Sequence, residues 1–180
     1  MFRSFVAMVL SFCFVASLCA ADVTYRITAS DNKIGFTGTK TGGKHDGGFK
    51  EFKGTATVKD GDLTKAQIKV EIDMTSIFTD TPQVTNHLKT PDFFDVKKYP
   101  RATFVSTKVE RKGDDYLVSG KLTMHGVTKE LSFPAKLEAS DAGFTLESNF
   151  EINRHDWKVS FGPGRVDDNV KLSLNVTAPR

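Results

Sequence analysis

Apolar and polar residues alternate along much of the chain, in one stretch over residues 23–72 and in another over residues 101–176. In the first stretch, for example, Val23, Tyr25 and Ile27 are each followed by a polar residue. A period of two places successive side chains on opposite faces of a β-strand, so the alternation predicts strands with one buried and one exposed face. Turn signals such as Asp60-Gly61 separate these strands. The pattern therefore predicts an all-β protein of about eight or nine antiparallel strands.

The alternation stops between residues 74 and 100, where the chain is aromatic and contains proline. Pro82 and Pro91 each follow a threonine, which is typical of the first turn of a helix. We therefore expect one or two short helices here. Leu88, Phe93 and Phe94 would pack this segment against the sheet as a helical cap.

Strands with one apolar face either stack as a sandwich or curl into a barrel. The interior of a barrel of about eight strands is filled by side chains or holds one small ligand. The apolar rows mix large residues such as Phe36, Phe104 and Phe150 with small ones such as Gly54 and Gly120. This mixture fits a filled core or an apolar slot. A membrane-spanning barrel would also show alternation, but a helical cap fits poorly in its thin wall.

The first 21 residues have the composition of a secretory signal peptide, in which Arg3 precedes an apolar run and a group of small residues. The run is shorter than the roughly 20 residues that a membrane span needs. We expect cleavage near Ala21 and a mature domain of residues 22–180 in the periplasm or outside the cell. Cys13 and Cys19 would be removed with the signal, so the mature protein would have no disulfide and no thiolate ligand.

The formal net charge of the whole chain is +3, and loss of Arg3 with the signal would lower it to about +2. Acidic and basic residues are interspersed along the predicted strands. A protein that binds nucleic acid needs a basic patch or stripe. We therefore expect no nucleic-acid partner.

Several segments, taken together and in order, resemble the YceI-like family of secreted bacterial polyisoprenoid-binding proteins. They are residues 24–38, 48–54, 70–79, 87–104, 120–129 and 153–157. The chain departs from the family pattern at Lys158, where glycine is expected after the aromatic residue, and in the basic, glycine-rich loop of residues 40–48.

The resemblance implies a lipocalin-like antiparallel barrel with a helical cap and a long apolar pore. The pore would hold an isoprenoid chain, either that of a polyprenyl phosphate or the tail of a quinone, for transport or storage. Such a chain needs a continuous apolar wall. The candidate wall and cap residues are Phe36, Phe52, Ile68, Val70, Leu88, Phe93, Phe94, Phe104, Leu122, Phe133, Phe150, Leu172 and Leu174. The head-group candidates, in a polar loop, are Arg154, His155 and Arg165.

Neither a catalytic constellation nor a metal site is expected. The four histidines, His45, His87, His125 and His155, are far apart and lack the spacing of zinc ligands. We expect a lipid-binding protein that is not an enzyme and has no cofactor other than its lipid. It would make at most transient contact with a membrane surface or a membrane protein, and it would be a monomer or homodimer. Two alternatives stay open. One is a quinone-linked redox or stress-response partner, and the other is a structural or interaction barrel without a ligand.

Overall fold

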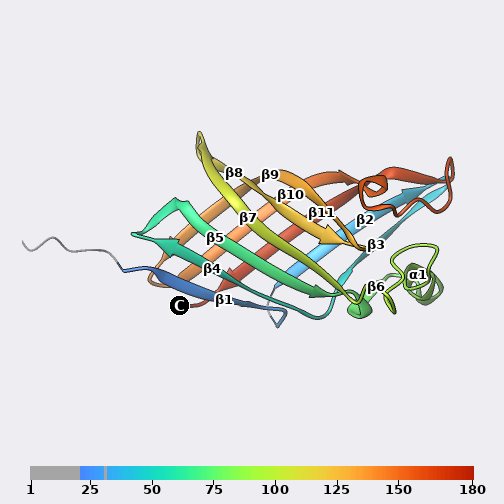
Figure 1. Ribbon diagram of the computed structural model, residues 1–180, viewed down its shortest axis with the longest axis horizontal. Coiled ribbons are helices and arrows are strands. Elements are labelled where there is room, and N and C mark those ends of the chain that lie inside the picture. The colour runs from blue at the N-terminus through green and yellow to red at the C-terminus, as the bar shows by residue number, and fades with distance from the viewer. Residues whose placement is uncertain (1–20, 31) are drawn as a thin grey trace, which may run out of the picture.

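The computed structural model describes residues 21–30 and 32–180. The predicted signal segment, apart from Ala21, lies outside these residues. In the part described, eleven strands form one sheet in which every pair of neighbours is antiparallel (Figure 1). In chain order the strands are β1 (Val23–Thr28), β2 (Lys33–Lys40), β3 (Gly43–Phe49), β4 (Phe52–Lys59), β5 (Asp62–Asp73), β6 (Ile77–Thr79), β7 (Arg101–Lys112), β8 (Asp115–Met124), β9 (Val127–Ser140), β10 (Gly143–Asn153) and β11 (Val166–Ala178).

The predicted fold class, a curled antiparallel β-structure with a short helical cap, is confirmed, but there are eleven strands in the described residues instead of about eight. The two strands that the pattern missed are β3 and β6. β3 contains Gly43, Gly47 and Gly48, so its sequence is typical of a bend and shows no alternation of apolar and polar residues. β6 has only three residues and lies inside the segment where the alternation stops.

The strand order in the sheet is β1-β4-β5-β7-β8-β9-β10-β11-β2-β3-β6. The sheet curls on itself because β3 and β4 are consecutive in the chain but lie near opposite ends of this order. β3 pairs with β2 and β6, and β4 pairs with β1 and β5. Only Lys50 and Glu51 separate β3 from β4. The chain therefore changes partners at this bend, and the first and last parts of the sheet are brought together.

One end of the curled sheet has a filled core. Tyr25 and Ile27 of β1 are buried, whereas Arg26 and Thr28 between and after them are exposed, as the alternation predicted. The Tyr25 ring packs against Phe144 with their centroids 5.8 Å apart, and its hydroxyl donates to the carbonyl of Ser140. This end also holds the carboxyl terminus (Figure 1).

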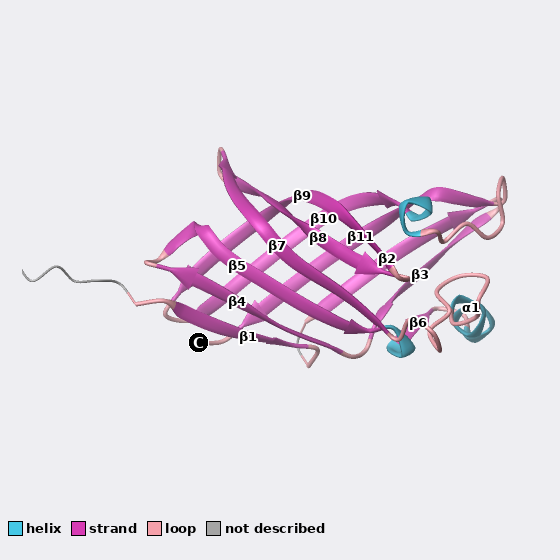
Figure 2. Cartoon of the chain, in the orientation of Figure 1, coloured by secondary structure: helices cyan, strands magenta, loops and turns pink. Residues whose placement is uncertain are grey.

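The cap lies at the opposite end, where Figure 2 places all the helical turns. They are η1 (Met74–Ser76), α1 (Pro82–Leu88) and η2 (Arg154–Trp157). Pro82 stands at the first position of α1, as its place after Thr81 predicted. Residues 89–98 consist mainly of turns and contain no second α-helix. Within residues 21–30 and 32–180, no helix has both the length and the apolar character needed to cross a membrane.

Candidate ligand cavity and its mouth

An apolar cavity of about 210 Å³ occupies the curled sheet between the filled core and the cap. The surface that it exposes is entirely apolar. Its wall includes these residues predicted from the sequence: Phe36, Ile68, Val70, Leu88, Phe93, Phe94, Phe104, Leu122, Phe133, Phe150, Leu172 and Leu174. Alternation turned one face of each strand inward, and curling of the sheet brought these faces together around one space. That these side chains contact a ligand stays a prediction.

Phe52 is the one predicted wall residue that the structure places elsewhere. It is buried in the main hydrophobic core, where it pairs across the sheet with Ile72, and it is not part of the cavity wall. Phe52 is the first residue of β4, directly after the bend from β3, and the position of that bend could not be obtained from alternation alone.

Aromatic rings form a continuous band along one side of the cavity. Phe133 and Phe150 stack with their centroids 4.6 Å apart, and Phe104 packs against Phe133 at 5.5 Å. Gly120 makes room for this band, because a Cβ atom at this position would lie 2.5 Å from the Phe104 ring. A small residue opposite a large one therefore shapes the wall.

A second and wider cavity, of about 890 Å³, opens at the cap end. It shares the wall residues Phe36, Gly38, Leu88, Phe93 and Val166 with the apolar cavity. These shared residues identify the second cavity as the mouth of the first. Its rim is formed by the end of β2, by α1 and by the loop of residues 161–165 that precedes β11.

The polar side chains in the mouth wall are either basic or hydroxyl-bearing. The basic ones are Lys40, His45, His87 and Arg165, and the hydroxyl-bearing ones are Thr39, Thr41 and Thr79. The described wall contains no aspartate or glutamate. A mouth of this composition suits an oxygen-rich or anionic group and opposes a cationic one.

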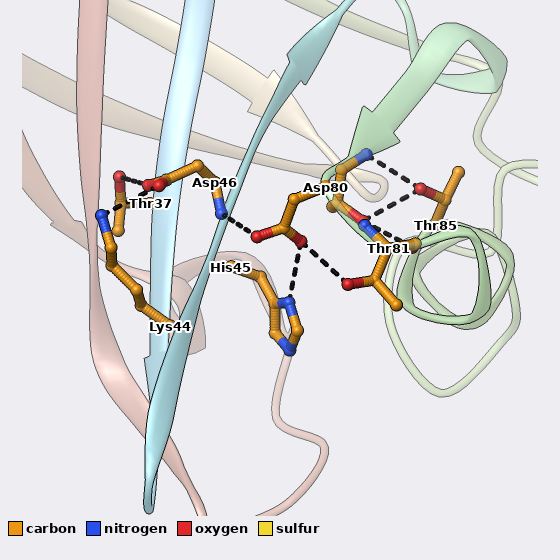
Figure 3. Close-up of polar contacts among 8 residues, drawn as sticks. Thr37, Lys44, His45, Asp46, Asp80, Thr81 and Thr85 are labelled. Atoms are coloured by element: carbon orange, nitrogen blue, oxygen red, sulfur yellow. Dashed lines mark hydrogen bonds and ion pairs between the residues drawn. The ribbon is translucent and has the colours of Figure 1, made fainter.

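His45 lies on β3 beside the start of the cap, and Figure 3 shows its contact with Asp80. His45 Nδ1 lies 2.9 Å from the Oδ1 atom of Asp80. Asp80 also accepts from the backbone N–H of Asp46 at 3.3 Å and from the Thr81 hydroxyl at 3.2 Å. The His45 hydrogen bond, aided by these two donors, lowers the pKa of Asp80 against the opposing effect of burial, so Asp80 is ionised at neutral pH.

His87, on α1, is held in an aromatic cluster at the same mouth. Its ring packs edge-on against Phe93 and Phe161, with centroid distances of 5.0 and 4.8 Å. Its Nε2 atom lies 2.9 Å from Asp92 Oδ2. Phe161 is 41% exposed and therefore presents an apolar edge at the entrance.

The structure separates the three predicted head-group residues. Arg165 lines the mouth. The Arg154 side chain reaches the apolar cavity, but its guanidinium donates to the carbonyls of Val159, Val166 and Asp167 at 2.8–3.0 Å, and the residue is only 4% exposed. His155 hydrogen-bonds Asp168 at 2.7 Å and lines neither cavity.

His45, His87, Lys40 and Phe161 line the mouth although the sequence did not select them. His45 is 35 residues from Asp80, and no motif links the two positions. A weak signal was available for His87, since Asp92 follows it by five residues across a turn. No group of three or more His, Cys, Asp or Glu in the described part of the chain is placed to hold a metal ion.

The chain matches the YceI-like domain over residues 25–178. It belongs to the YceI-like family. It is 35% identical over 136 residues to Protein YceI of Escherichia coli O17:K52:H18, an alignment that covers 71% of each chain.

Two solved structures have the same fold. The chain aligns with BcnA of Burkholderia cenocepacia with a TM-score of 0.78 and 24% identity, over 84% of this chain and 99% of BcnA. It aligns with a polyisoprenoid-binding domain from Saccharophagus degradans with a TM-score of 0.69 and 16% identity, over 87% and 99% of the two chains. At these identities the likeness establishes the curled antiparallel fold of the YceI-like family.

Proposed function

We propose that the protein is an exported lipid-binding protein that holds an isoprenoid chain in its apolar cavity for transport or storage in the periplasm. The observation that carries the proposal is a cavity with an entirely apolar surface, continuous with a polar mouth. Burial of each CH₂ group contributes about 0.8 kcal/mol, so a long apolar tail can bind tightly without a hydrogen bond. Membership of the YceI-like family, together with the likeness to the polyisoprenoid-binding domain from Saccharophagus degradans, supports the same class of ligand.

The geometry favours binding over catalysis. Among the described residues, the one ionisable side chain in the wall of the apolar cavity is Arg154, and its guanidinium is turned to backbone carbonyls. A redox partner or enzyme acting on a bound quinone would need an acid or base beside the reacting ring. We therefore propose a carrier with no cofactor other than its lipid, and we place the sequence-predicted redox role second.

Export would follow from the predicted signal segment of residues 1–21. Transfer to or from a membrane would require transient contact, and the exposed Phe161 beside Lys40 and Arg165 gives the mouth end the composition of a membrane-facing rim.

The direct test is native mass spectrometry of the protein purified from the periplasm of a host that exports it, followed by extraction of any bound molecule into organic solvent. We expect a mass above that of the cleaved chain and an isoprenoid species in the extract. A protein that is isolated empty and also fails to take up added prenyl lipids would contradict the proposal. It would then favour a structural or interaction barrel.

A further inference from the structure

The orientation of His45 is set by Asp80. Three donors converge on the Asp80 carboxylate: His45 Nδ1, the Asp46 backbone N–H and the Thr81 hydroxyl (Figure 3). Because the pKa of Asp80 is lowered and the carboxylate is ionised, it accepts a hydrogen bond from Nδ1. The proton on Nδ1 is therefore committed to Asp80, which leaves Nε2 as the ring nitrogen available to a partner.

The Nε2 atom of His45 is shielded from solvent and has no hydrogen-bond partner among the residues that the structure describes. Buried polar atoms in native proteins are nearly always paired, and an unpaired one costs free energy. His45 belongs to the wall of the mouth cavity. An oriented ring with one unsatisfied nitrogen at the entrance of an apolar cavity suggests a partner that is not part of the chain.

The charges around the mouth decide which kind of partner suits this nitrogen. Lys40 and Arg165 line the same cavity, and neither forms an ion pair within the described residues. His87 also lines it, but its Nε2 is occupied by Asp92. With basic side chains and no carboxylate in the wall, the mouth favours a negatively charged oxygen ligand.

We propose that His45, oriented by Asp80, recognises the head group of the bound lipid, and that this head group is anionic, of the prenyl phosphate type. The tail would lie in the apolar cavity, and in the complex the ring would be the imidazolium, donating Nδ1–H to the Asp80 carboxylate and Nε2–H to a phosphate oxygen, with Arg165 and Lys40 adding charge. The inference rests on the proposed lipid-binding function. It places head-group recognition on β3 and the turn before it, within the basic, glycine-rich segment of residues 40–48 where the chain departs from the family pattern.

The test compares two ligands with the same tail, geranylgeranyl phosphate and geranylgeraniol, by titration calorimetry on the exported protein. We expect the phosphate to bind about tenfold more tightly to the wild type, the size of one charge-assisted hydrogen bond. In His45→Phe we expect most of this preference, measured as the ratio of the two affinities, to be lost. His45→Gln keeps an N–H donor and retains part of the preference.

Two further variants keep the inference falsifiable. Asp80→Asn preserves the size of the side chain but removes the charge that holds the ring, so we expect a smaller preference for phosphate even if His45→Phe does not fold. His155→Phe removes a histidine from a similar His–Asp pair that lines neither cavity, and we expect the wild-type preference.

A preference that survives in His45→Phe, or that is lost in His155→Phe instead, would overturn the role of His45. Equal affinity of the wild type for the two ligands would overturn the anionic head group. Failure of the wild type to bind either ligand would refute the proposed function itself, so the two failures are distinguishable.

Discussion

Lys158 occupies a backbone conformation that residues with a side chain rarely adopt. Its φ and ψ angles of 59° and 23° are left-handed, and it follows Trp157 at the end of η2. In this region the Cβ atom crowds the following carbonyl, which costs about 1–2 kcal/mol for residues other than glycine. The expectation of glycine after the aromatic residue, drawn from the resemblance, thus has a physical reason in the turn.

Replacement of Lys158 by glycine should stabilise the protein by about 0.5–1 kcal/mol, because the relief of strain is partly offset by a more flexible unfolded chain. The measurement is the free energy of unfolding in urea. Lys158→Ala is the matched control, since alanine retains the Cβ atom, and it should leave stability nearly unchanged. A stabilising Lys158→Ala would show that the strain is not the cause.

Arg154 has a structural role in the fold that its residue type alone does not indicate. An arginine in a polar loop resembles an anion-binding residue, and Arg154 was predicted as one. The structure buries its guanidinium against three backbone carbonyls, so it holds the η2 turn and the start of β11 together. The sequence shows the charge, but only the folded loop shows what it faces.

At the scale of elements, β3 depends on close approach between backbones. A Cβ atom at Gly47 would lie 2.4 Å from the carbonyl oxygen of Phe78 in β6 and 2.5 Å from the ring of Phe36 in β2. Glycine therefore lets β3 lie between its two neighbours. The polar, glycine-rich sequence that hid this strand from pattern analysis is a requirement of its packing.

Gly47→Ala should destabilise the protein by about 1–3 kcal/mol, the usual cost of forcing extra volume into a packed site. Gly43→Ala lies in the same strand and is the matched control, because a Cβ atom there would meet nothing within 4 Å. Urea denaturation of both variants provides the comparison. A similar loss of stability in both would mean that strand propensity and not close approach is responsible.

The cap is joined to the sheet by the Asp80 cluster at the end of β6. The folded pKa of Asp80 is lowered, chiefly by the hydrogen bond from His45. The ionised carboxylate therefore contributes stability above its ordinary pKa of about 3.9, and this contribution is lost as the pH falls through the lower folded value.

Acidification below about pH 3.9 should accordingly loosen the cap, and the Asp80-dependent part of this change should be absent in Asp80→Asn. Hydrogen exchange of the α1 amides as a function of pH, compared with those of β8, measures it. Identical acid profiles for the wild type and Asp80→Asn would contradict a role for Asp80 in holding the cap.

On the scale of the whole molecule, the same sheet is filled at one end and hollow at the other. The filled end packs Tyr25, Phe144 and small residues such as Ala56 and Ala178, whereas larger inward side chains surround the cavity toward the cap. The ligand space therefore follows from the curvature of the sheet together with the distribution of side-chain sizes.

Leu172→Trp should fill the cavity from the middle of β11 and lower the affinity for a prenyl lipid by at least about tenfold, since indole volume replaces space for the tail. Lys171→Trp adds the same ring on the outer face of the same strand and should bind like the wild type. Lipid affinity of the two variants, each first shown to fold by near-ultraviolet circular dichroism, is the measurement. Unchanged binding by Leu172→Trp would place the tail elsewhere.

The sequence by itself determined the strand alternation, the cap over residues 74–100 and the inward apolar rows, because a period of two and the helix-start signals are local properties of the chain. The position of each apolar row in the folded protein depends on the curvature of the sheet and on the bend between β3 and β4. Together these bring segments that are far apart in the sequence into contact. For that reason only the tertiary structure decided that Phe52 is core and Arg154 is structural. Only the folded structure likewise brings His45 into contact with Asp80, which lies 35 residues further along the chain.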